Sequence, residues 1–350
     1  MRVSLSLGSS LTRYLIKNKF LAKARFPLVL MLEVTHACNL ACEGCGRIHE
    51  YRETMRETLS TEECIRAVEE CSTPVVTVTG GEPLMHPEID KIIRGILNKK
   101  RHIYLCTNGV LLAEAIKKLK PSKYFNINVH IDGLAKTHDA IAGRGVFERA
   151  TNAIRAAKQA GFKVCTNTTI YKNTSEDEIK ELFAFLEGLG VDGMLVSPGF
   201  SFEHNENEIF LCRKEIQERF GFIYGISKKY KILNSPLYLK FLKGERYLKC
   251  TPWGSPTRNY LGWKSPCYLI TDTHYKTFDE CMKNTDWDKY QEGNDPRCKN
   301  CMMHCGFEPT VVLEGGKRLS DIIEMAKWSF SKENREKRNY RNSRGCPKRF

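Results

Sequence analysis

Short apolar runs of strand length alternate with amphipathic helical stretches from residue 27 to about residue 200. The strand-like runs cover residues 27–34, 74–80, 102–108, 124–133, 162–170 and 193–199. Between them, apolar positions at helical spacing predict helices at residues 60–71, 86–98, 111–119, 146–160 and 176–189. Strands joined by helical crossovers run parallel, with the helices outside the sheet. The pattern predicts an α/β fold, a partial or complete α/β barrel over residues 26–205.

The alternation stops after about residue 205. Residues 206–312 are rich in proline and cysteine, which predicts a smaller, loop-rich second domain. Residues 313–350 are polar and basic, with one helical stretch at 319–330, and the last twenty residues are expected to be disordered by composition. Residues 1–25 form a separate amphipathic segment.

Polar and glycine-rich segments follow the expected strands. They are GGEP at 80–83, TNG at 107–109, HIDG at 130–133 and SPG at 197–199. In such barrels ligands bind at the C-terminal strand ends, so these segments are expected to share one rim. Turn formation is the competing explanation for the Asn-Gly and Asp-Gly pairs.

Three cysteines follow the first strand at C-x3-C-x2-C spacing: Cys38, Cys42 and Cys45. Disulfides, zinc and iron–sulfur are the candidates for such a set. No secretory leader is evident and no apolar run is long enough to cross a bilayer, so a reducing cytoplasm is expected and disulfides are disfavoured. A four-ligand zinc site is usually closed, whereas three thiolates on a cubane cluster leave one iron open to a small molecule. The spacing therefore favours an iron–sulfur cluster with an open position.

The cysteine loop, GGEP, TNG and the Asp-Gly loop, in this order, make residues 27–205 resemble the radical S-adenosylmethionine (SAM) superfamily. The resemblance implies a radical SAM partial (β/α)6 barrel and a [4Fe–4S] cluster held by Cys38, Cys42 and Cys45. The open iron of that cluster would take the amino and carboxylate groups of S-adenosyl-L-methionine. Its reduction, by an electron donor such as flavodoxin or ferredoxin, would release a 5'-deoxyadenosyl radical.

The same resemblance assigns contacts to the cofactor. Gly80 and Gly81 would let the backbone approach the methionine amine, and Glu82 would offer that cation a carboxylate. Four other polar residues of the rim are assigned to the ribose or to nearby groups: Asn108, His130, Asp132 and Ser197. The residue before the third cysteine is often aromatic in the superfamily, but here it is Gly44, so the backbone is expected to make the adenine contact at this position.

Within the superfamily, residues 26–310 are similar to the hopanoid-biosynthesis enzymes. The similarity is carried by PLVLMLEVTHACNLACEGCG, YLCTNG, VDGMLVSPGFSFE, CTPWGSPT and CKNCMMHCGFEPT. It implies that the 5'-deoxyadenosyl radical adds to the terminal alkene of hopene (diploptene) and forms the carbon–carbon bond of adenosylhopane. The adduct radical must then gain a hydrogen atom. Cys106, at the end of the third strand, is the expected donor because a thiol S–H bond is weaker than an aliphatic C–H bond; a buried strand cysteine is the alternative.

A second set of cysteines lies nearer the C-terminus, as C-x11-G-x4-C followed by C-x2-C-x3-C. This spacing resembles the SPASM and twitch cluster domains of some radical enzymes, and so implies an auxiliary [4Fe–4S] cluster. The expected ligands are Cys250, Cys267, Cys298 and Cys301, with Cys305 as a rival for one place. A structural zinc ion, or no metal, stays open as an alternative.

The formal net charge is +14, which favours an anionic surface as a partner. Residues 10–25 place Leu11, Tyr14, Leu15, Leu21 and Ala22 on one helical arc, away from the basic side chains. This pattern fits a helix on the inner surface of a membrane, and packing of the arc on the barrel is the alternative. The basic tail lacks the interleaved aromatic residues of single-strand binders, so nucleic acid is not an expected partner.

Two other functions remain in view. A peptide-modifying radical maturase would share the cluster domain, but it is expected to carry a docking domain before the barrel, for which about 25 residues are too few. A noncatalytic iron–sulfur binding protein would use the basic surface and would not cleave SAM. For hopene the expected pocket is deep and apolar, lined by Phe200, Phe202, Trp253 and Trp263.

Overall fold

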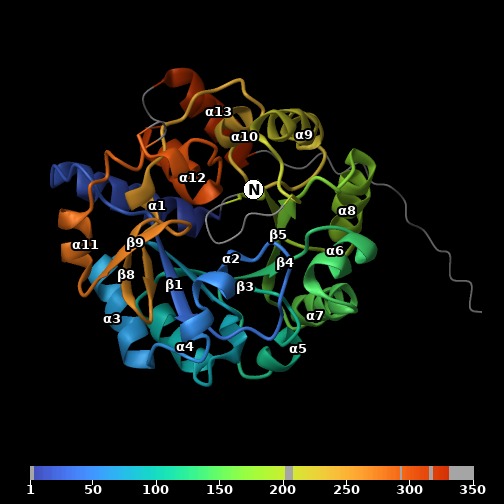
Figure 1. The fold of residues 1–350 in the computed structure, drawn as a ribbon, viewed down its shortest axis with the longest axis horizontal. Coiled ribbons are helices and arrows are strands. Elements are labelled where there is room, and N and C mark those ends of the chain that lie inside the picture. Colours follow the sequence, from blue (N-terminus) through green and yellow to red (C-terminus); the bar gives the residue numbers. More distant parts are fainter. Residues whose placement is uncertain (1–3, 202–207, 292–293, 315–317, 331–350) are drawn as a thin grey trace, which may run out of the picture.

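Six parallel strands form the centre of the molecule and follow one another in chain order (Figure 1). The structure is a computed structural model that describes residues 4–201, 208–291, 294–314 and 318–330. The strands are β1 (Val29–Thr35), β2 (Val75–Gly80), β3 (His102–Thr107), β4 (Phe125–His130), β5 (Lys163–Ile170) and β6 (Gly193–Pro198). Five of the six lie within the predicted runs, and β1 extends one residue beyond its run, to Thr35. The predicted α/β class and the partial (β/α)6 barrel are confirmed.

Helices cover the outside of these strands. They are α3 (Thr61–Cys71), α4 (Ile89–Asn98), α5 (Leu112–Ala115), α6 (Ala135–Ala142), α7 (Val146–Gln159) and α8 (Glu176–Gly188). Local signals fix their starts: Ser60 and Glu63 form a reciprocal capping box at α3, and Ser175 caps α8. The helix predicted at 111–119 is much shorter in the structure, and α6 was not predicted because its eight residues carry little apolar periodicity.

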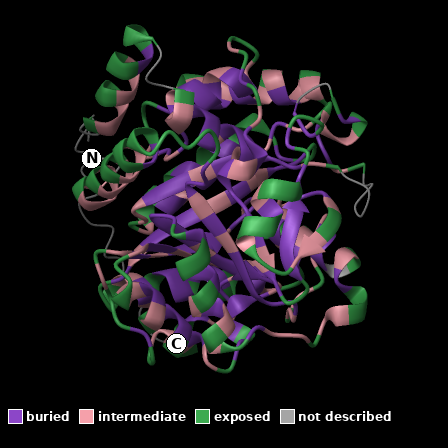
Figure 2. Cartoon of the chain, turned by 90° about the vertical axis from the view of Figure 1, so that its left-hand side faces the viewer, coloured by how far each residue is buried: buried purple, intermediate pink, exposed green. Residues whose placement is uncertain are grey.

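Alternation along the strands separates the core from the barrel interior. On β1, Leu30, Leu32 and Val34 are buried on the helix side, whereas Val29 and Met31 point into the interior. The inward residues of the six strands therefore line one central cavity, and the outward residues form the main hydrophobic core. Figure 2 shows the strands largely buried, in purple, with the exposed residues, in green, mostly on the surrounding helices and loops.

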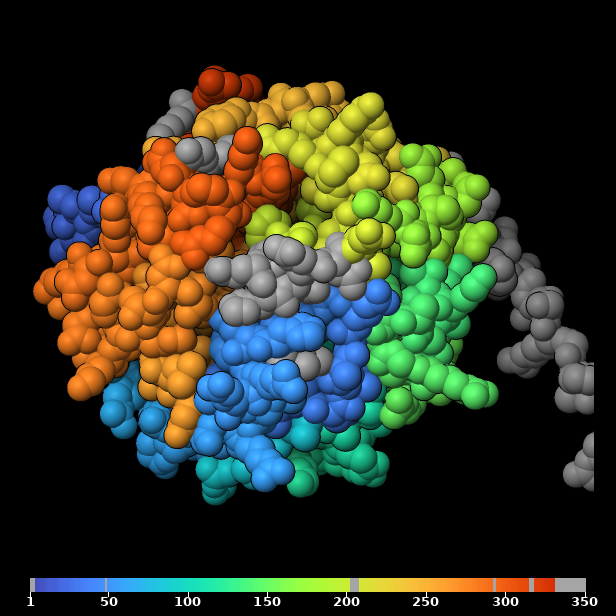
Figure 3. Space-filling view, viewed as in Figure 1, coloured from blue at the N-terminus to red at the C-terminus, as the bar shows by residue number. Residues whose placement is uncertain are grey.

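The C-terminal segment continues the barrel sheet. Strand β7 (Thr257–Asn259) pairs in parallel with β1, and β8 (Gly262–Pro266) and β9 (Thr271–Tyr275) add antiparallel strands beyond it. The space-filling view shows this segment, in orange, packed beside the residues that follow β1, in blue (Figure 3). The predicted domain limits at residues 25, 205 and 312 stay predictions.

The segment after residue 205 was expected to be rich in loops, but the structure contains several helices there, which the prediction missed except for the last one. These are α9 (Arg213–Ile226), α10 (Pro236–Leu242), α11 (Phe278–Asn284), α12 (His304–Glu314) and, as predicted, α13 (Leu319–Phe330). The described residues also contain four 3-10 turns, at Arg52–Thr54, Pro83–Met85, Pro252–Gly254 and Pro296–Cys298. The last twenty residues, which were predicted to be disordered, lie outside the described residues.

Helix α1 (Leu5–Phe20) lies across the N-terminal ends of the strands, where it shares a groove with Pro74, Lys123 and Tyr124. The predicted helix at 10–25 is therefore present but begins and ends about five residues earlier. Leu11 faces the barrel cavity, so this part of the predicted arc packs on the barrel, as the alternative proposed. No helix of the described ranges has both the length and the hydropathy needed to cross a membrane.

Candidate active site

The first three cysteines lie in the loop between β1 and the short helix α2 (Gly46–Glu50), and all three line the central cavity. This cavity has a volume of about 560 Å³. The loop is bonded to the GGEP segment, because the backbone N–H of Gly81 donates to Thr35 at 2.9 Å and that of Glu82 to Ala37 at 2.7 Å. The rim predicted from the strand ends therefore brings the cysteine loop and the second strand's loop together.

Glycine is required at both positions of the Gly80-Gly81 pair. A Cβ atom at Gly80 would lie 2.1 Å from the carbonyl oxygen of Thr35, and one at Gly81 would lie 2.2 Å from that of Ala37. Gly80 also has a φ of 141°, which other residues rarely adopt. The pair thus lets the GGEP backbone pack directly on the start of the cysteine loop. The predicted approach to a methionine amine stays a prediction.

The thiols of the loop are close enough to influence one another. Burial, together with the neighbouring Cys45 and Cys38, raises the pKa of Cys42 to about 12. Burial raises the pKa of Cys38 to about 11. Three thiolates would be stable here only beside a bound cation, which fits an iron–sulfur cluster as the group they hold. Over the described residues, no group of three or more His, Cys, Asp or Glu side chains is placed to hold a single metal ion.

Glu82 is buried and organises the adjacent TNG loop. Its carboxylate accepts from the backbone N–H groups of Leu84 and Asn108, at 3.0 and 2.8 Å, and from the hydroxyl of Thr107 at 2.8 Å. Burial raises the pKa of Glu82 to about 7. Asn108 in turn donates to the side chain of Asn39, in the cysteine loop, at 2.8 Å. Glu82 and Asn108 therefore line the cavity beside the three thiols, where the sequence placed them.

His130 and Asp132 form an ion pair on the wall of the same cavity. Nε2 of His130 lies 2.5 Å from Oδ2 of Asp132, whose Oδ1 accepts from the backbone N–H of Thr169 at 2.7 Å. Burial alone lowers the pKa of His130, but the charge of Asp132 and the hydrogen bond between them leave it raised. The pair therefore presents two titratable groups to the cavity, with the protonated form of His130 favoured by Asp132. Ser197 is buried on β6 and is not among the described residues that line the cavity, so its assigned contact stays a prediction.

Aromatic side chains surround Gly44, where the superfamily often has an aromatic residue. A Cβ atom at Gly44 would lie 3.4 Å from the ring of Phe210 and 3.5 Å from the hydroxyl of Tyr171. Both rings line the cavity, and their centroids are 5.9 Å apart. Sequence reasoning missed these two residues. Tyr171 directly follows β5, so its position on the rim was a signal, whereas nothing in the sequence connects Phe210 with residue 44.

Cys106 lies on β3 and points into the cavity, as predicted from its place at the strand end. Burial raises the pKa of its thiol to about 11, so the S–H bond is retained at neutral pH. Asn128, opposite it on β4, donates to the sulfur at 3.7 Å. The protein therefore places an intact, oriented thiol in the barrel interior.

The apolar wall of the cavity differs in part from the predicted one. Phe200 lines the cavity, but Trp263 is buried against Phe278, and Trp253 packs edge-on against Trp287. Phe202 lies outside the described residues. The wall is instead made by strand residues and by helix α12, and it includes Leu28, Val29, Met31, Val75, Leu195, Met303 and Val312.

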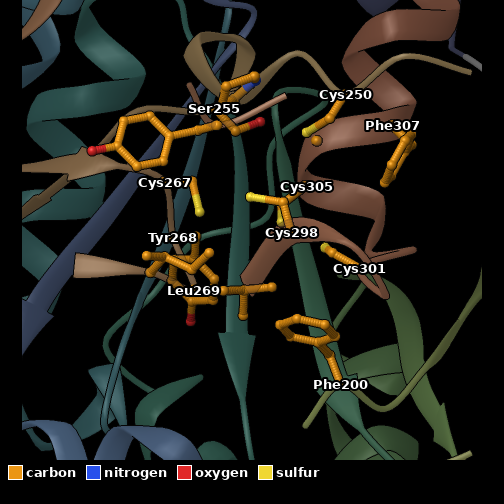
Figure 4. A pocket seen from close by; sticks show the side chains of 14 residues that line it. Phe200, Cys250, Ser255, Cys267, Tyr268, Leu269, Cys298, Cys301, Cys305 and Phe307 are labelled. Atoms are coloured by element: carbon orange, nitrogen blue, oxygen red, sulfur yellow. The ribbon is translucent and has the colours of Figure 1, made fainter. Parts of the chain in front are cut away.

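The second cysteine set converges from separate elements on one enclosed cavity. Figure 4 shows Cys267, Cys298 and Cys305 directed toward the same space, with Cys250 and Cys301 at its edge. Burial, and after it the neighbouring thiols, raise the pKa of four of them: Cys250, Cys298, Cys301 and Cys305. An added Cβ at Gly306 would lie 2.4 Å from the sulfur of Cys250, so this glycine makes room for that thiol. The convergence fits a polynuclear cluster. A [4Fe–4S] cluster with every iron bound to the protein needs four protein ligands, and five thiols are present. Cys305 also lines the central cavity.

A buried ion network, which the sequence did not predict, connects the two cysteine sets. Arg47, two residues after Cys45, donates to the backbone carbonyl of Tyr268, which follows Cys267. Arg47 also pairs with Glu50 at 2.6 Å and with Glu33 at 3.3 Å. Lys264 of β8 is fully buried and pairs with Glu50 at 2.7 Å. The network fixes the loop after the third cysteine against the C-terminal segment.

Comparison with known proteins agrees with this geometry. The family model described as the radical SAM superfamily matches residues 32–186, and a domain of unknown function (DUF3463) matches residues 194–325. An AdoMet-dependent heme synthase of Nitratidesulfovibrio vulgaris is 30% identical over 258 residues, which cover 68% of this chain and 69% of the relative. A GTP 3',8-cyclase of Aliarcobacter butzleri is 32% identical over 168 residues. That match covers 46% of this chain, and the chain spans 52% of the cyclase.

The fold is also found in solved structures. A crystal structure of Streptococcus suis SuiB bound to precursor peptide SuiA aligns with a TM-score of 0.64, at 16% identity, over 88% of this chain and 77% of that chain. The superfamily's cofactors are a [4Fe–4S] cluster and S-adenosyl-L-methionine, and the second cysteine set is consistent with an additional cluster. From its fold, its cysteine loop and its matched relatives, this chain belongs to the radical SAM superfamily.

Proposed function

We propose that this chain is an adenosylhopane synthase of the HpnH type, which adds the 5'-deoxyadenosyl group of SAM to the terminal alkene of hopene. One observation carries the proposal. A mostly apolar cavity extends from the cysteine loop through the barrel, and the protonated thiol of Cys106 lies on its wall. An apolar polycyclic alkene fits such a wall, and the polar end of the cavity lies at the rim, beside the three cysteines. The segments that resemble hopanoid-biosynthesis enzymes lie around this cavity.

Each rim residue has a role in this proposal. Cys38, Cys42 and Cys45 would hold the cluster, which when bound supplies the electron that cleaves SAM. Glu82 would balance the charge of the methionine amine, because it is a buried carboxylate close to Cys38. The Asp132–His130 pair and Asn108 would orient the ribose through hydrogen bonds. Tyr171 and Phe210 would flank the adenine in place of the missing aromatic residue at position 44.

Cys106 would complete the reaction by giving its hydrogen atom to the carbon radical left after addition. The bonds balance as follows: one electron breaks the C5'–S bond of SAM and releases methionine, the alkene loses its π bond, one carbon gains the adenosyl carbon, and the other gains hydrogen from sulfur. Cys106 is left as a thiyl radical, which one electron from the external donor and one proton return to the thiol. The amide of Asn128 would keep the sulfur in place, with the S–H bond free to point into the cavity.

The test is a single anaerobic incubation of reconstituted enzyme with SAM, a reductant and hopene, analysed by mass spectrometry. The proposal requires the mass of hopene plus 5'-deoxyadenosine. Formation of free 5'-deoxyadenosine without this adduct would show a radical enzyme with another substrate. Absence of both would exclude SAM cleavage and leave the noncatalytic binding protein.

The second candidate is another radical SAM enzyme with an auxiliary cluster. It is favoured by the heme synthase similarity, which at 30% identity over 258 residues extends beyond the barrel. Peptide-modifying maturases are included in this candidate. The enzyme is incubated with SAM, a reductant and either a tetrapyrrole or a candidate peptide, and 5'-deoxyadenosine is measured in each case. Formation of 5'-deoxyadenosine that depends on one of these compounds would identify it as the substrate in place of hopene.

We also propose that four of the five C-terminal thiols hold a second [4Fe–4S] cluster, with Cys250, Cys267, Cys298 and Cys301 as ligands. Cys305 remains the rival for one place, because it contacts both cavities. Iron, sulfide and zinc analysis of a variant with Cys38, Cys42 and Cys45 all changed to Ala decides the point. Residual iron and sulfide support the second cluster, zinc supports a structural ion, and no metal ends both.

A further inference from the structure

Helix α13 carries an outward stripe of apolar side chains. They are Leu319, Ile322, Ile323 and Phe330, and Leu319 is 73% exposed. The acidic residues of the helix face inward, where Asp321 pairs with Arg246 at 2.5 Å and Glu324 with Lys240 at 2.7 Å. A surface helix ordinarily buries its apolar stripe and exposes its charges. Met325 of the same helix packs on the core, so the exposed apolar stripe on α13 favours a contact beyond the described residues.

Helix α1 has a similar outer face. Ile16 is 64% exposed and Phe20 is 90% exposed, and Leu5 is exposed near the start of the helix. These are not the residues of the arc that packs inward. The first 32 residues of the chain contain six basic residues and no acidic one. The exposed apolar side chains of α1 are therefore flanked only by positive charge.

A basic groove runs between α1 and the barrel. It has a volume of about 1460 Å³, and eight basic but only two acidic residues line it. Arg13 and Lys17 contribute from α1, and Lys100 and Lys123 from the loops that precede β3 and β4. This excess of positive charge lies at the N-terminal end of the strands, opposite the rim that holds the first cysteines.

The two helices lie at the same end of the molecule. Leu11 of α1 and Val312, near the end of α12, line the same central cavity, and α13 is the next helix after α12. Exposed apolar side chains and a basic groove at one end match the two requirements of an interfacial membrane contact, an apolar layer and anionic headgroups.

We infer that the outer faces of α1 and α13 dock this protein on an anionic phospholipid bilayer. The basic groove then takes lipid headgroups, and the apolar side chains enter the boundary of the acyl layer. Docking also places the cavity near the lipid phase, because Leu11 of α1 lines the cavity together with Leu28, Val29 and Val75 at the strand starts. An apolar substrate would enter at this end, beneath α1; that last step rests on the proposed function.

The experiment is sedimentation of the full chain with vesicles, in the absence of SAM and of hopene. Vesicles of phosphatidylcholine alone are compared with vesicles that contain phosphatidylglycerol. Two variants change the proposed surface, Ile16→Glu with Phe20→Glu, and Leu319→Glu with Ile323→Glu. The matched control is Tyr260→Glu with Leu261→Glu, because these exposed residues lie in the turn after β7, at the opposite end of the barrel.

The inference predicts that wild type binds the anionic vesicles and that 0.5 M salt weakens binding. Each surface variant should lose at least about tenfold in affinity, while the control is unchanged. Equal binding of all proteins, or no binding of wild type, overturns the inference. A wild-type dimer that the variants convert to monomer, without vesicle binding, would assign the surface to a second copy of the chain.

The result does not depend on catalysis, so it is separable from the proposed function. If the adduct forms at all, the surface variants should make less of it from hopene in vesicles but a normal amount from hopene in detergent. Equal loss in both media would contradict entry at this end of the barrel.

Discussion

The side-chain amide of Asn128 lies 3.7 Å from the sulfur of Cys106, across two paired strands of the barrel. The contact holds the thiol at a fixed position in the cavity, and burial keeps it protonated at neutral pH. A protonated thiol is a hydrogen-atom donor, whereas a thiolate is a nucleophile. The environment of Cys106 therefore suits radical quenching better than covalent catalysis.

Replacement of Cys106 by Ala should leave SAM cleavage intact and remove the final hydrogen transfer. We expect 5'-deoxyadenosine to form with hopene present, and the reduced adduct to fall by more than about tenfold. Cys165→Ala is the control, because Cys165 is a buried strand cysteine outside the residues that line the cavity. Unchanged amount and stereochemistry of the adduct would remove Cys106 from the mechanism.

Replacement of Gly306 by Ala should displace Cys250, since the new methyl group would lie 2.4 Å from its sulfur. If Cys250 is a ligand, the iron content of the reconstituted protein should fall from about eight to about four atoms per chain. Gly225→Ala on α9 is the matched control, because no atom lies within 4 Å of its added Cβ. Full iron content in Gly306→Ala would exclude Cys250 as a ligand.

Arg47→Ala should be strongly destabilising, because it leaves the buried carboxylates of Glu33 and Glu50 with one cation fewer. Loss of one member of a buried ion network costs about 3–5 kcal/mol. Arg94→Ala removes an exposed pair with Asp90 and should cost less than about 1 kcal/mol. Urea unfolding of the two variants measures the difference, and similar values for both would show that the network does not stabilise the fold.

Glu308 of α12 gives the stability of the chain a specific pH dependence. Burial raises the pKa of its carboxyl to about 7 from 4.5, while its hydrogen bond from the N–H of Ser235, at 2.9 Å, opposes the shift. The folded protein therefore holds this proton at a pH where the unfolded chain releases it, so this group's contribution to stability falls as pH rises from about 4.5 through 7. Glu308→Gln should flatten the slope of unfolding free energy against pH in that window, and an unchanged slope would contradict the assignment.

The barrel could be predicted from the sequence because its elements are local. Alternating apolar runs identify strands, and capping residues such as Ser60 and Ser175 mark helix starts. The rim also followed, since parallel strands bring their C-terminal ends together. Helix α12 could not be predicted: it contains Gly306 and Pro309 and has almost no amphipathic pattern, so its conformation depends on tertiary contacts.

Long-range relationships in the site were likewise invisible in the sequence. Arg47 and Tyr268 are 221 residues apart, and only the folded chain shows that they join the two cysteine sets. The rings beside Gly44 come from segments more than 120 residues away. The expected tryptophans were misplaced because large aromatic side chains more often fill a core than line a ligand cavity.

The most direct test of the account is the origin of the hydrogen atom in the adduct. A thiol exchanges its proton with solvent. The reaction run in D2O with hopene and unlabelled SAM should therefore give adenosylhopane with one deuterium, on the alkene carbon that does not bond to the adenosyl group. Adduct without deuterium would contradict hydrogen transfer from Cys106, and absence of any adduct, beside ample 5'-deoxyadenosine, would contradict the proposed function itself.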